Sequence, residues 1–266
     1  MLTILQTGCS RINEDEKKMK KRNIAEIVLV IIFAGFVFFL GWTQFKVGSD
    51  KCGILVSKTG GVNSEPVLPG KFSWHWEFLI PTNAELRLFG LTPYTETKTV
   101  QGTLPSADVY SAVYESHPDF SYSFDFSISG KVAPADIAEL VKNGDISDSD
   151  GLKSYLDSAY TSLANKAAVF ILDKAAAAGS SFRPESLKPD DILNGIETAR
   201  AWPYIVFTDF SITSSKLPDR TLYNSARDTY IEEQKRLQER AVERKKKVSE
   251  LLQQFPELQD LFPGNN

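Results

Sequence analysis

The sequence predicts an α+β protein that is carried on a single N-terminal transmembrane helix and ends in a long charged helix. Three observations predict this fold class: an apolar segment over residues 24–45, alternating strand-like segments around a helical middle region, and a charged segment without Gly or Pro after residue 218. The 266 residues suffice for one large domain or two small ones. With 42% hydrophobic residues, the chain is neither wholly disordered nor a polytopic membrane protein.

The N-terminal apolar segment has the length of a membrane anchor. Residues 24–45 read IAEIVLVIIFAGFVFFLGWTQF, and residues 27–42 carry no charge. At about 1.5 Å per residue the segment spans roughly 33 Å, close to the ~30 Å hydrocarbon thickness of a bilayer. Trp42 stands at the depth where aromatic belts form. The anchor side chains that we expect to face lipid are Ile24, Ile27, Leu29, Ile32, Phe36, Phe39 and Trp42.

Two alternatives to a retained anchor stay open. A cleaved signal peptide has a shorter apolar region of about 7–15 residues, and bulky Trp42 and Phe45 stand close before the passable cleavage site at residues 47–49. A buried core helix is the other alternative, although such a helix is seldom apolar on every face. The length of the run favours the anchor.

Flanking charge predicts the orientation of the anchor. Five basic residues crowd the N-terminal side, and only Lys46, Lys51 and Lys58 follow on the other side. Because positive charge stays inside, we expect a cytoplasmic N-terminus and an extracytoplasmic main domain. Cys9 and Cys52 then lie on opposite sides of the membrane, and no disulfide is predicted. The five basic residues are Lys17, Lys18, Lys20, Lys21 and Arg22.

The region after the anchor reads as strands, then helices, then a strand. The clearest strand is 120–132, where aromatic and aliphatic residues alternate with Ser and Asp at a period of two. Pro134 and Gly144 bound a short helix, and a broad apolar stripe ending at Gly179 marks a long one. This order favours an α+β fold of mostly antiparallel strands with packed helices. The expected strands are 52–57, 71–81, 86–89, 94–100, 109–114, 120–132 and 204–213; the expected helices are 134–144, 152–179 and one after Pro189.

An aromatic segment allows two interpretations. Phe72, Trp74, Trp76 and Phe78 are spaced two apart, which places them on one face if 71–81 is a strand. That strand belongs either to the core or to an aromatic hairpin that dips into the membrane interface, where Trp is favoured.

The C-terminal segment 217–254 predicts a helix with an eleven-residue apolar repeat. Eleven residues correspond to about 3.67 per turn, which favours a straight or slightly right-handed bundle. We expect self-association as a coiled-coil-like bundle through this stripe; the alternatives are a helix folded back on the main domain and a single solvated helix. The stripe comprises Ala226, Tyr230, Leu237, Ala241, Val248 and Leu252.

No catalytic, cofactor-binding or metal-binding residues are predicted. His75 and His117 have no second His or Cys at ligand spacing, and no nucleophile or phosphate-binding motif occurs. Cys52 reads as a small buried apolar residue. The stretch 23–218 carries 15 basic and 22 acidic residues, and such an acidic body disfavours nucleic-acid binding. We expect no enzymatic activity and no cofactor.

The order of several short motifs resembles the SPFH (band 7) superfamily of stomatin, prohibitin and flotillin. Behind an N-terminal anchor come Gly53-Ile54, the Gly60-Gly61 turn, and Leu68-Pro69-Gly70 followed by an aromatic segment that ends at Pro81. The closing part has a hydrophobic strand at 209–212, then Leu217-Pro218, then a charged helix bearing Ala and Gln.

The resemblance implies a non-enzymatic scaffold whose copies form a ring on a membrane. With the orientation above it points to the bacterial HflK and HflC branch, and so to the bacterial inner membrane with the main domain periplasmic. The implied partners are lipid, copies of this chain or a homologous SPFH chain, and an FtsH-type membrane protease that the ring encloses or regulates. The domains are then a basic tail 1–23, the anchor 24–45, an SPFH-like domain 46–216, a C-terminal helix 217–254 and a tail 255–266.

Two other function classes stay open. One is a membrane-anchored extracytoplasmic module that binds a peptide or lipid ligand. The other is an enzyme whose functional residues converge only in three dimensions.

Overall fold

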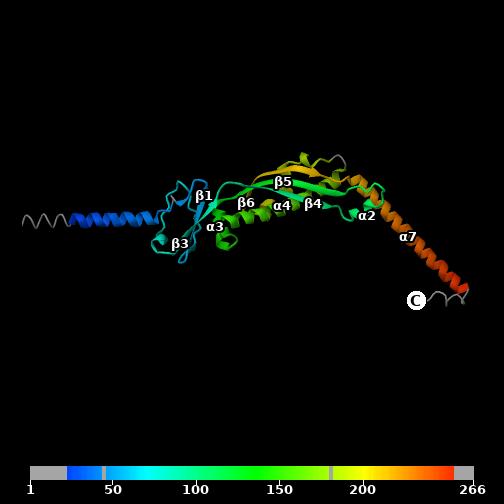
Figure 1. The fold of residues 1–266 in the computed structure, drawn as a ribbon, viewed down its shortest axis with the longest axis horizontal. Coiled ribbons are helices and arrows are strands. Elements are labelled where there is room, and N and C mark those ends of the chain that lie inside the picture. The colour runs from blue at the N-terminus through cyan, green and yellow to red at the C-terminus, as the bar shows by residue number, and fades with distance from the viewer. Residues whose placement is uncertain (1–22, 44–45, 180–181, 255–266) are drawn as a thin grey trace, which may run out of the picture. The chain divides into compact units, whose positions relative to one another are not determined.

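A computed structural model describes residues 23–43, 46–179 and 182–254 (Figure 1). The protein is a mixed α+β structure with antiparallel sheets and one apolar helix near its N-terminus, which confirms the predicted fold class at this level. The chain forms two compact units. The first takes in residues up to Tyr94 together with Ser129–Ala159 and Trp202–Thr208, and the second takes in Thr95–Ile128, Tyr160–Ala201 and the residues from Asp209 onward.

The first unit contains a three-stranded sheet in the order β2-β1-β3. The central strand β1 (Lys51–Ser57) pairs antiparallel with β2 (Gly61–Val62) and with β3 (Ala84–Gly90). Its side chains Cys52, Ile54 and Leu55 are fully buried and Val56 is half-buried, as expected for a central strand with both neighbours in place. Gly61 has φ 70°, a conformation that suits the tight β1–β2 turn.

Helix α3 (Pro134–Asn143) packs against β1 and β2. Pro134 opens the helix, and Gly144 closes it in the left-handed conformation with its N–H donating to the carbonyl of Leu140. Both ends agree with the sequence prediction.

The second three-stranded sheet has the order β4-β5-β6, formed by β4 (Tyr94–Thr103), β5 (Ser121–Val132) and β6 (Ile205–Lys216). The alternation predicted for β5 is confirmed, because Phe124, Phe126 and Ile128 are fully buried between more exposed polar neighbours. In the second unit, Phe126 stacks on Phe210 of β6 with ring centroids 5.5 Å apart.

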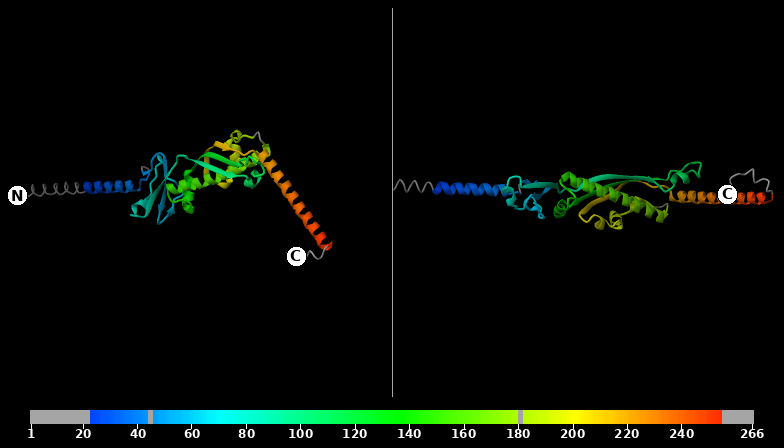
Figure 2. Two further views of the ribbon diagram at one scale, coloured as in Figure 1. Left: turned by 45° about the vertical axis from the view of Figure 1, so that its right-hand side comes forward. Right: turned by 90° about the horizontal axis from the view of Figure 1, so that it is seen from below.

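The long helix α4 (Ser149–Ala178) agrees with the predicted stripe. Figures 1 and 2 show it running beside β4 and β5. From Tyr160 on, its inward face is built from fully buried small and aliphatic residues, which let the helix approach its neighbours closely. Three shorter helices follow it: η4 (Pro184–Ser186), α5 (Pro189–Gly195) and α6 (Thr198–Ala201).

Two expected strands are not strands. Residues 71–81 contain the 3₁₀ helix η2 (Trp76–Leu79). Before η2, the backbone groups of Ser73 and His75 bond to Thr43 and Gly41 at the end of the N-terminal helix instead of to a neighbouring strand. Residues 109–114 overlap helix α2 (Ala107–Ser111). Ala107 and Tyr110 lie three residues apart in α2, and this helical spacing places them against α7 (Arg220–Gln254). Tyr114, which follows the helix, reaches α7 through a hydrogen bond from its hydroxyl to Ser225.

The base of α7 is held by an aromatic cluster, which we call the basal cluster. Tyr223 lies at its centre, edge-on to Phe120 at 5.3 Å and to Tyr110 at 5.5 Å between ring centroids. The Tyr223 hydroxyl donates a 2.6 Å hydrogen bond to the carbonyl of Pro105. The basal cluster comprises Leu104, Ala107, Phe120, Tyr223 and Ala226, with Tyr110, Tyr114 and Leu172 packed against it.

Ala226 is 0% exposed within the basal cluster. We therefore predict that a larger side chain at this position destabilises the protein. We expect Ala226→Leu to lower the free energy of unfolding by about 1–3 kcal/mol through overpacking. The matched control is Ala241→Leu, which makes the same change at an exposed position of the same helix. Chemical denaturation followed by circular dichroism tests this, and equal effects of the two substitutions would contradict the packing described here.

A surface ion pair predicts a pH-dependent contribution to stability. Lys216 Nζ donates to the Asp119 carboxylate at 2.6 Å, and this bond, together with bonds from Ser121, lowers the pKa of Asp119 from 3.8 to about 2. Because the folded pKa is depressed, the contribution is present above pH 3.8 and is lost as the pH falls through about 2. We expect Lys216→Met to lower the melting temperature at neutral pH, with the difference from the parent vanishing toward pH 2. Thermal melts over this pH range measure the effect, and a pH-independent difference would refute it.

Candidate membrane-anchoring and self-association sites

The N-terminal helix Asn23–Gly41 is, among the described residues, the one helix long and apolar enough to cross a membrane. Its 19 residues give roughly 28 Å at 1.5 Å per residue, close to the hydrocarbon thickness. The predicted anchor residues from Ile24 to Phe39 are all exposed, at 59–69%. Such exposure on every face is unlike a core helix, so that alternative is wrong.

The helix ends at Gly41, not at residue 45 as predicted. Trp42 forms an isolated antiparallel bridge with Trp74 and therefore lies outside the helix; residues 44–45 fall outside the described part of the chain. Gly41 is the close-approach point, because a Cβ there would lie 2.4 Å from Nε1 of the Trp74 indole. The helix thus stops where Trp74 packs against its backbone.

Residues 73–75 supply hydrogen-bond donors and an acceptor to the end of the helix, and we call them the helix clasp. The Trp74 indole Nε1 donates to the carbonyl of Phe38 at 3.1 Å, and the backbone N–H of His75 donates to the carbonyl of Gly41 at 2.8 Å. The buried Thr43 donates from its backbone N–H to the carbonyl of Ser73 at 3.1 Å. Carbonyls in the last turn of a helix lack intrahelical partners, and the clasp satisfies two of them.

The predicted aromatic segment turns its aromatic side chains outward. Phe72 and Trp76 are 58% and 51% exposed, and Trp74 is also exposed, whereas the polar residues between them are half-buried. The core-strand interpretation of this segment is therefore wrong. Phe72 stacks on Phe38 with ring centroids 6.0 Å apart, so the row continues the apolar surface of the helix. We call Phe72, Trp74 and Trp76 the aromatic row.

The remaining member of the predicted set, Phe78, lies apart from the aromatic row. It is half-buried, and Lys46 Nζ lies 4.2 Å from its ring centroid. On the polar side of the segment, His75 Nε2 and Ser73 Oγ share a 2.8 Å hydrogen bond, and His75 Nδ1 lies 3.9 Å from a Glu77 carboxylate oxygen. His75 therefore organises the local turn.

The exposure of helix α7 changes along its length. Up to Tyr230, which contacts the Tyr110 ring at 5.7 Å, it packs on the basal cluster. Beyond Tyr230, nearly every described residue is exposed. The exposed apolar residues there include Ile231, Leu237, Val242 and Leu251.

The predicted oligomerisation stripe needs one correction. Ala226 is fully buried in the basal cluster of its own chain, so it is not available to a partner. Leu237 and Ala241 are exposed and Val248 is half-buried, while the side chain of Leu252 lies outside the described set. The part of the stripe open to a partner therefore begins after Tyr230.

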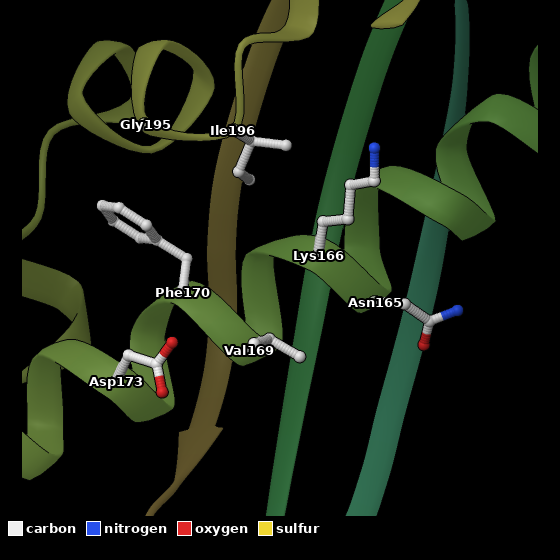
Figure 3. A pocket seen from close by; sticks show the side chains of 7 residues that line it. All are labelled: Asn165, Lys166, Val169, Phe170, Asp173, Gly195 and Ile196. Atoms are coloured by element: carbon white, nitrogen blue, oxygen red, sulfur yellow. The ribbon is translucent and has the colours of Figure 1, made fainter.

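A groove between α4 and α5 was not predicted from the sequence (Figure 3). It holds about 470 Å³ and combines apolar Val169, Phe170 and Ile196 with the charged Lys166 and Asp173. The Phe170 ring reaches toward Gly195, where a Cβ would lie 2.5 Å from the ring. No pattern in the sequence indicates the groove, because Phe170 belongs to α4 and Gly195 to α5.

Groups of three or more His, Cys, Asp or Glu side chains able to hold a metal ion are absent from the described part of the chain. Burial raises the pKa of the Cys52 thiol to about 11, which disfavours the nucleophilic thiolate.

The protein is therefore a mixed α+β protein with antiparallel sheets and one apolar helix near its N-terminus. No protein-family model matches the chain. An uncharacterised protein of Treponema pallidum (strain Nichols) is 28% identical to it over 199 residues, which is 73% of this chain and 67% of that protein. This similarity supplies a relative without an assigned activity.

The clasp predicts that Gly41 tolerates no side chain. We expect Gly41→Val to displace the Trp74 indole and lower the free energy of unfolding by about 1–3 kcal/mol. Gly35→Val is the matched control, since a Cβ at Gly35 meets nothing within 4 Å. Thermal unfolding of the full chain in detergent, followed by tryptophan emission, compares the two. Equal melting temperatures would show that the clasp does not constrain the helix end.

Proposed function

We propose that this protein is a non-enzymatic, membrane-anchored oligomeric scaffold of the SPFH/band 7 type. The observation that carries the proposal is the apolar surface of α7 beyond Tyr230, which no other part of the described chain covers. Leu237 and Val242 are exposed there within an otherwise charged helix. Apolar side chains left in water at helical spacing favour association with a second helix.

The N-terminal helix supports the membrane part of the proposal. Exposed apolar side chains on all its faces suit lipid, and its length suits a single crossing. By the distribution of positive charge, the N-terminus is cytoplasmic and the main domain lies on the other side of the membrane. The resemblance to the HflK and HflC branch implies that this membrane is a bacterial inner membrane. Anchored copies share a high effective concentration, so that weak contacts through α7 suffice for assembly.

The motifs behind the resemblance occupy turns and helix starts in the fold. Gly60-Gly61 forms the β1–β2 turn, and Gly70 adopts φ 78° after Leu68-Pro69. Leu217-Pro218 precedes the first turn of α7. The resemblance that these motifs carry implies a scaffold that organises a membrane microdomain, with a homologous chain as a second subunit and an FtsH-type protease as the enclosed partner.

A second candidate function is a membrane-anchored module that binds a peptide or lipid ligand. The α4–α5 groove favours it, because an apolar surface flanked by Lys166 and Asp173 suits a small ligand or an extended segment with apolar and charged groups. The scaffold is preferred because it explains the exposed surface of α7, which the ligand-binding module leaves without a role.

The scaffold predicts that a charge in the exposed stripe breaks the assembly. We expect Leu237→Lys to weaken self-association about tenfold or more, since burying one leucine contributes about 1.5–3 kcal/mol. Mass photometry of the full chain in detergent micelles, repeated over a range of protein concentrations, measures the distribution of oligomers.

The matched control is Glu239→Gln, which changes the charge by the same +1 on the opposite side of α7, about 200° around the helix. We expect this variant to assemble like the parent. A parent protein that stays monomeric at every concentration would overturn the scaffold and favour the ligand-binding module.

A further inference from the structure

We propose that the aromatic row docks into the headgroup–acyl boundary of the leaflet in which the N-terminal helix ends. The inference rests on the proposed membrane anchor and is independent of self-association through α7. The aromatic row would therefore contact lipid directly. This contact would hold the first unit against the bilayer surface, in addition to the anchor.

The first support is the inverted burial of the segment. In a water-exposed turn the aromatic side chains pack inward and the polar ones outward, whereas here the opposite holds. Phe72 and Trp76 stand outward while Ser73 and His75 are half-buried and hydrogen-bonded to each other. Exposed aromatic clusters of this kind mark interaction sites, and Trp is the residue most favoured at the membrane interface.

The second support is the depth at which the clasp holds the row. Trp74 bonds to the carbonyl of Phe38, and Phe72 stacks on the Phe38 ring, so both aromatic groups lie level with the last turn of the helix. If the helix crosses the hydrocarbon core, its last turn lies at the boundary between acyl chains and headgroups. The aromatic row therefore reaches the same boundary without any rearrangement of the chain.

The third support is the chemistry of the helix end. Free carbonyls at the end of a membrane helix are costly where water is scarce. The clasp satisfies the carbonyls of Phe38 and Gly41 with an indole N–H and a backbone N–H, while the Trp74 side chain stays partly exposed. This arrangement fits a low-water environment better than bulk solvent, where water would satisfy the same carbonyls.

The fourth support is the charge around the row. Lys71, next to Phe72 in the sequence, is exposed, whereas the Glu77 side chain is turned inward, only 17% exposed. Lysine side chains at this depth extend their ammonium groups toward lipid phosphates. The local charge therefore suits phospholipid headgroups.

Depth-dependent fluorescence quenching tests the proposal on the full chain reconstituted into phosphatidylcholine–phosphatidylglycerol vesicles. The test variant carries Trp42→Phe and Trp202→Phe, so that it emits only from Trp74 and Trp76. The control variant carries Trp42→Phe, Trp74→Phe and Trp76→Phe, so that it emits only from Trp202, which packs edge-on against Phe207. Vesicles contain lipids brominated either near the headgroup end of the acyl chains or near the bilayer centre.

We expect the tryptophan emission of the test variant to be blue-shifted. Bromines near the headgroups should quench most of this emission, and bromines near the bilayer centre should quench little of it. Aqueous acrylamide should not quench it. Emission that acrylamide quenches and bromolipid does not would overturn the proposal. Trp76→Phe within the test variant separates the two indoles: a remaining Trp74 signal that is not quenched by bromolipid would also overturn it. Vesicle flotation of each variant reports insertion of the anchor separately, so that failure of the anchor is distinguished from failure of the docking.

Discussion

The contact between the Trp74 indole and the end of the N-terminal helix is the constraint on which the first unit depends. Trp74 occupies the space that a side chain at position 41 would fill, and its Nε1 bonds to the carbonyl of Phe38. Helix propensity alone gives no reason for the helix to stop there, because Trp42 and Thr43 are tolerated in helices. The stop is set by tertiary contacts. The Trp74 indole N–H and the backbone N–H of His75 donate to the carbonyls of Phe38 and Gly41, which a further helical turn would have used.

The same contact explains why the aromatic segment was misread from its sequence. A period of two predicts which side chains share a face, but it does not say whether that face is buried. In β5 the alternating Phe124 and Phe126 face other parts of the second unit and are buried. Around Trp74 the neighbour is an exposed apolar helix distant in sequence, and the aromatic face stays outward.

Features set by local chemistry were predictable, and features set by a distant partner were not. The bounds of α3 follow from Pro134 and Gly144, and the alternation of β5 follows from its own residues. Helix α2 was missed because Ala107 and Tyr110 gain their helical role from α7, more than a hundred residues away. The α4–α5 groove could not be predicted at all, since Gly195 and Phe170 must first be brought together.

The burial of Ala226 shows the same limit within the predicted stripe. Its eleven-residue spacing to Leu237 is real, yet one member packs in the basal cluster and the other stays exposed. A repeat in a helix determines which side of the helix a side chain faces. It does not determine which part of the protein packs against that side at each position along the helix axis. The repeat therefore serves two successive partners, its own chain at the base and, in the proposed assembly, a second copy beyond Tyr230.

The exposed apolar surfaces at the two ends of the chain call for partners of different kinds. Side chains from Ile24 to Phe39 are exposed all around their helix with hardly a charge among them, which suits a lipid surround. On α7 the apolar residues form narrow columns between charged ones, which suits a protein partner because the charges stay in water while the column is buried. Such a narrow column gives weak association in three dimensions, and anchoring in a bilayer raises the effective concentration at which it acts. In the proposed assembly, anchoring of the N-terminal helix in lipid therefore makes weak contacts between copies of α7 sufficient.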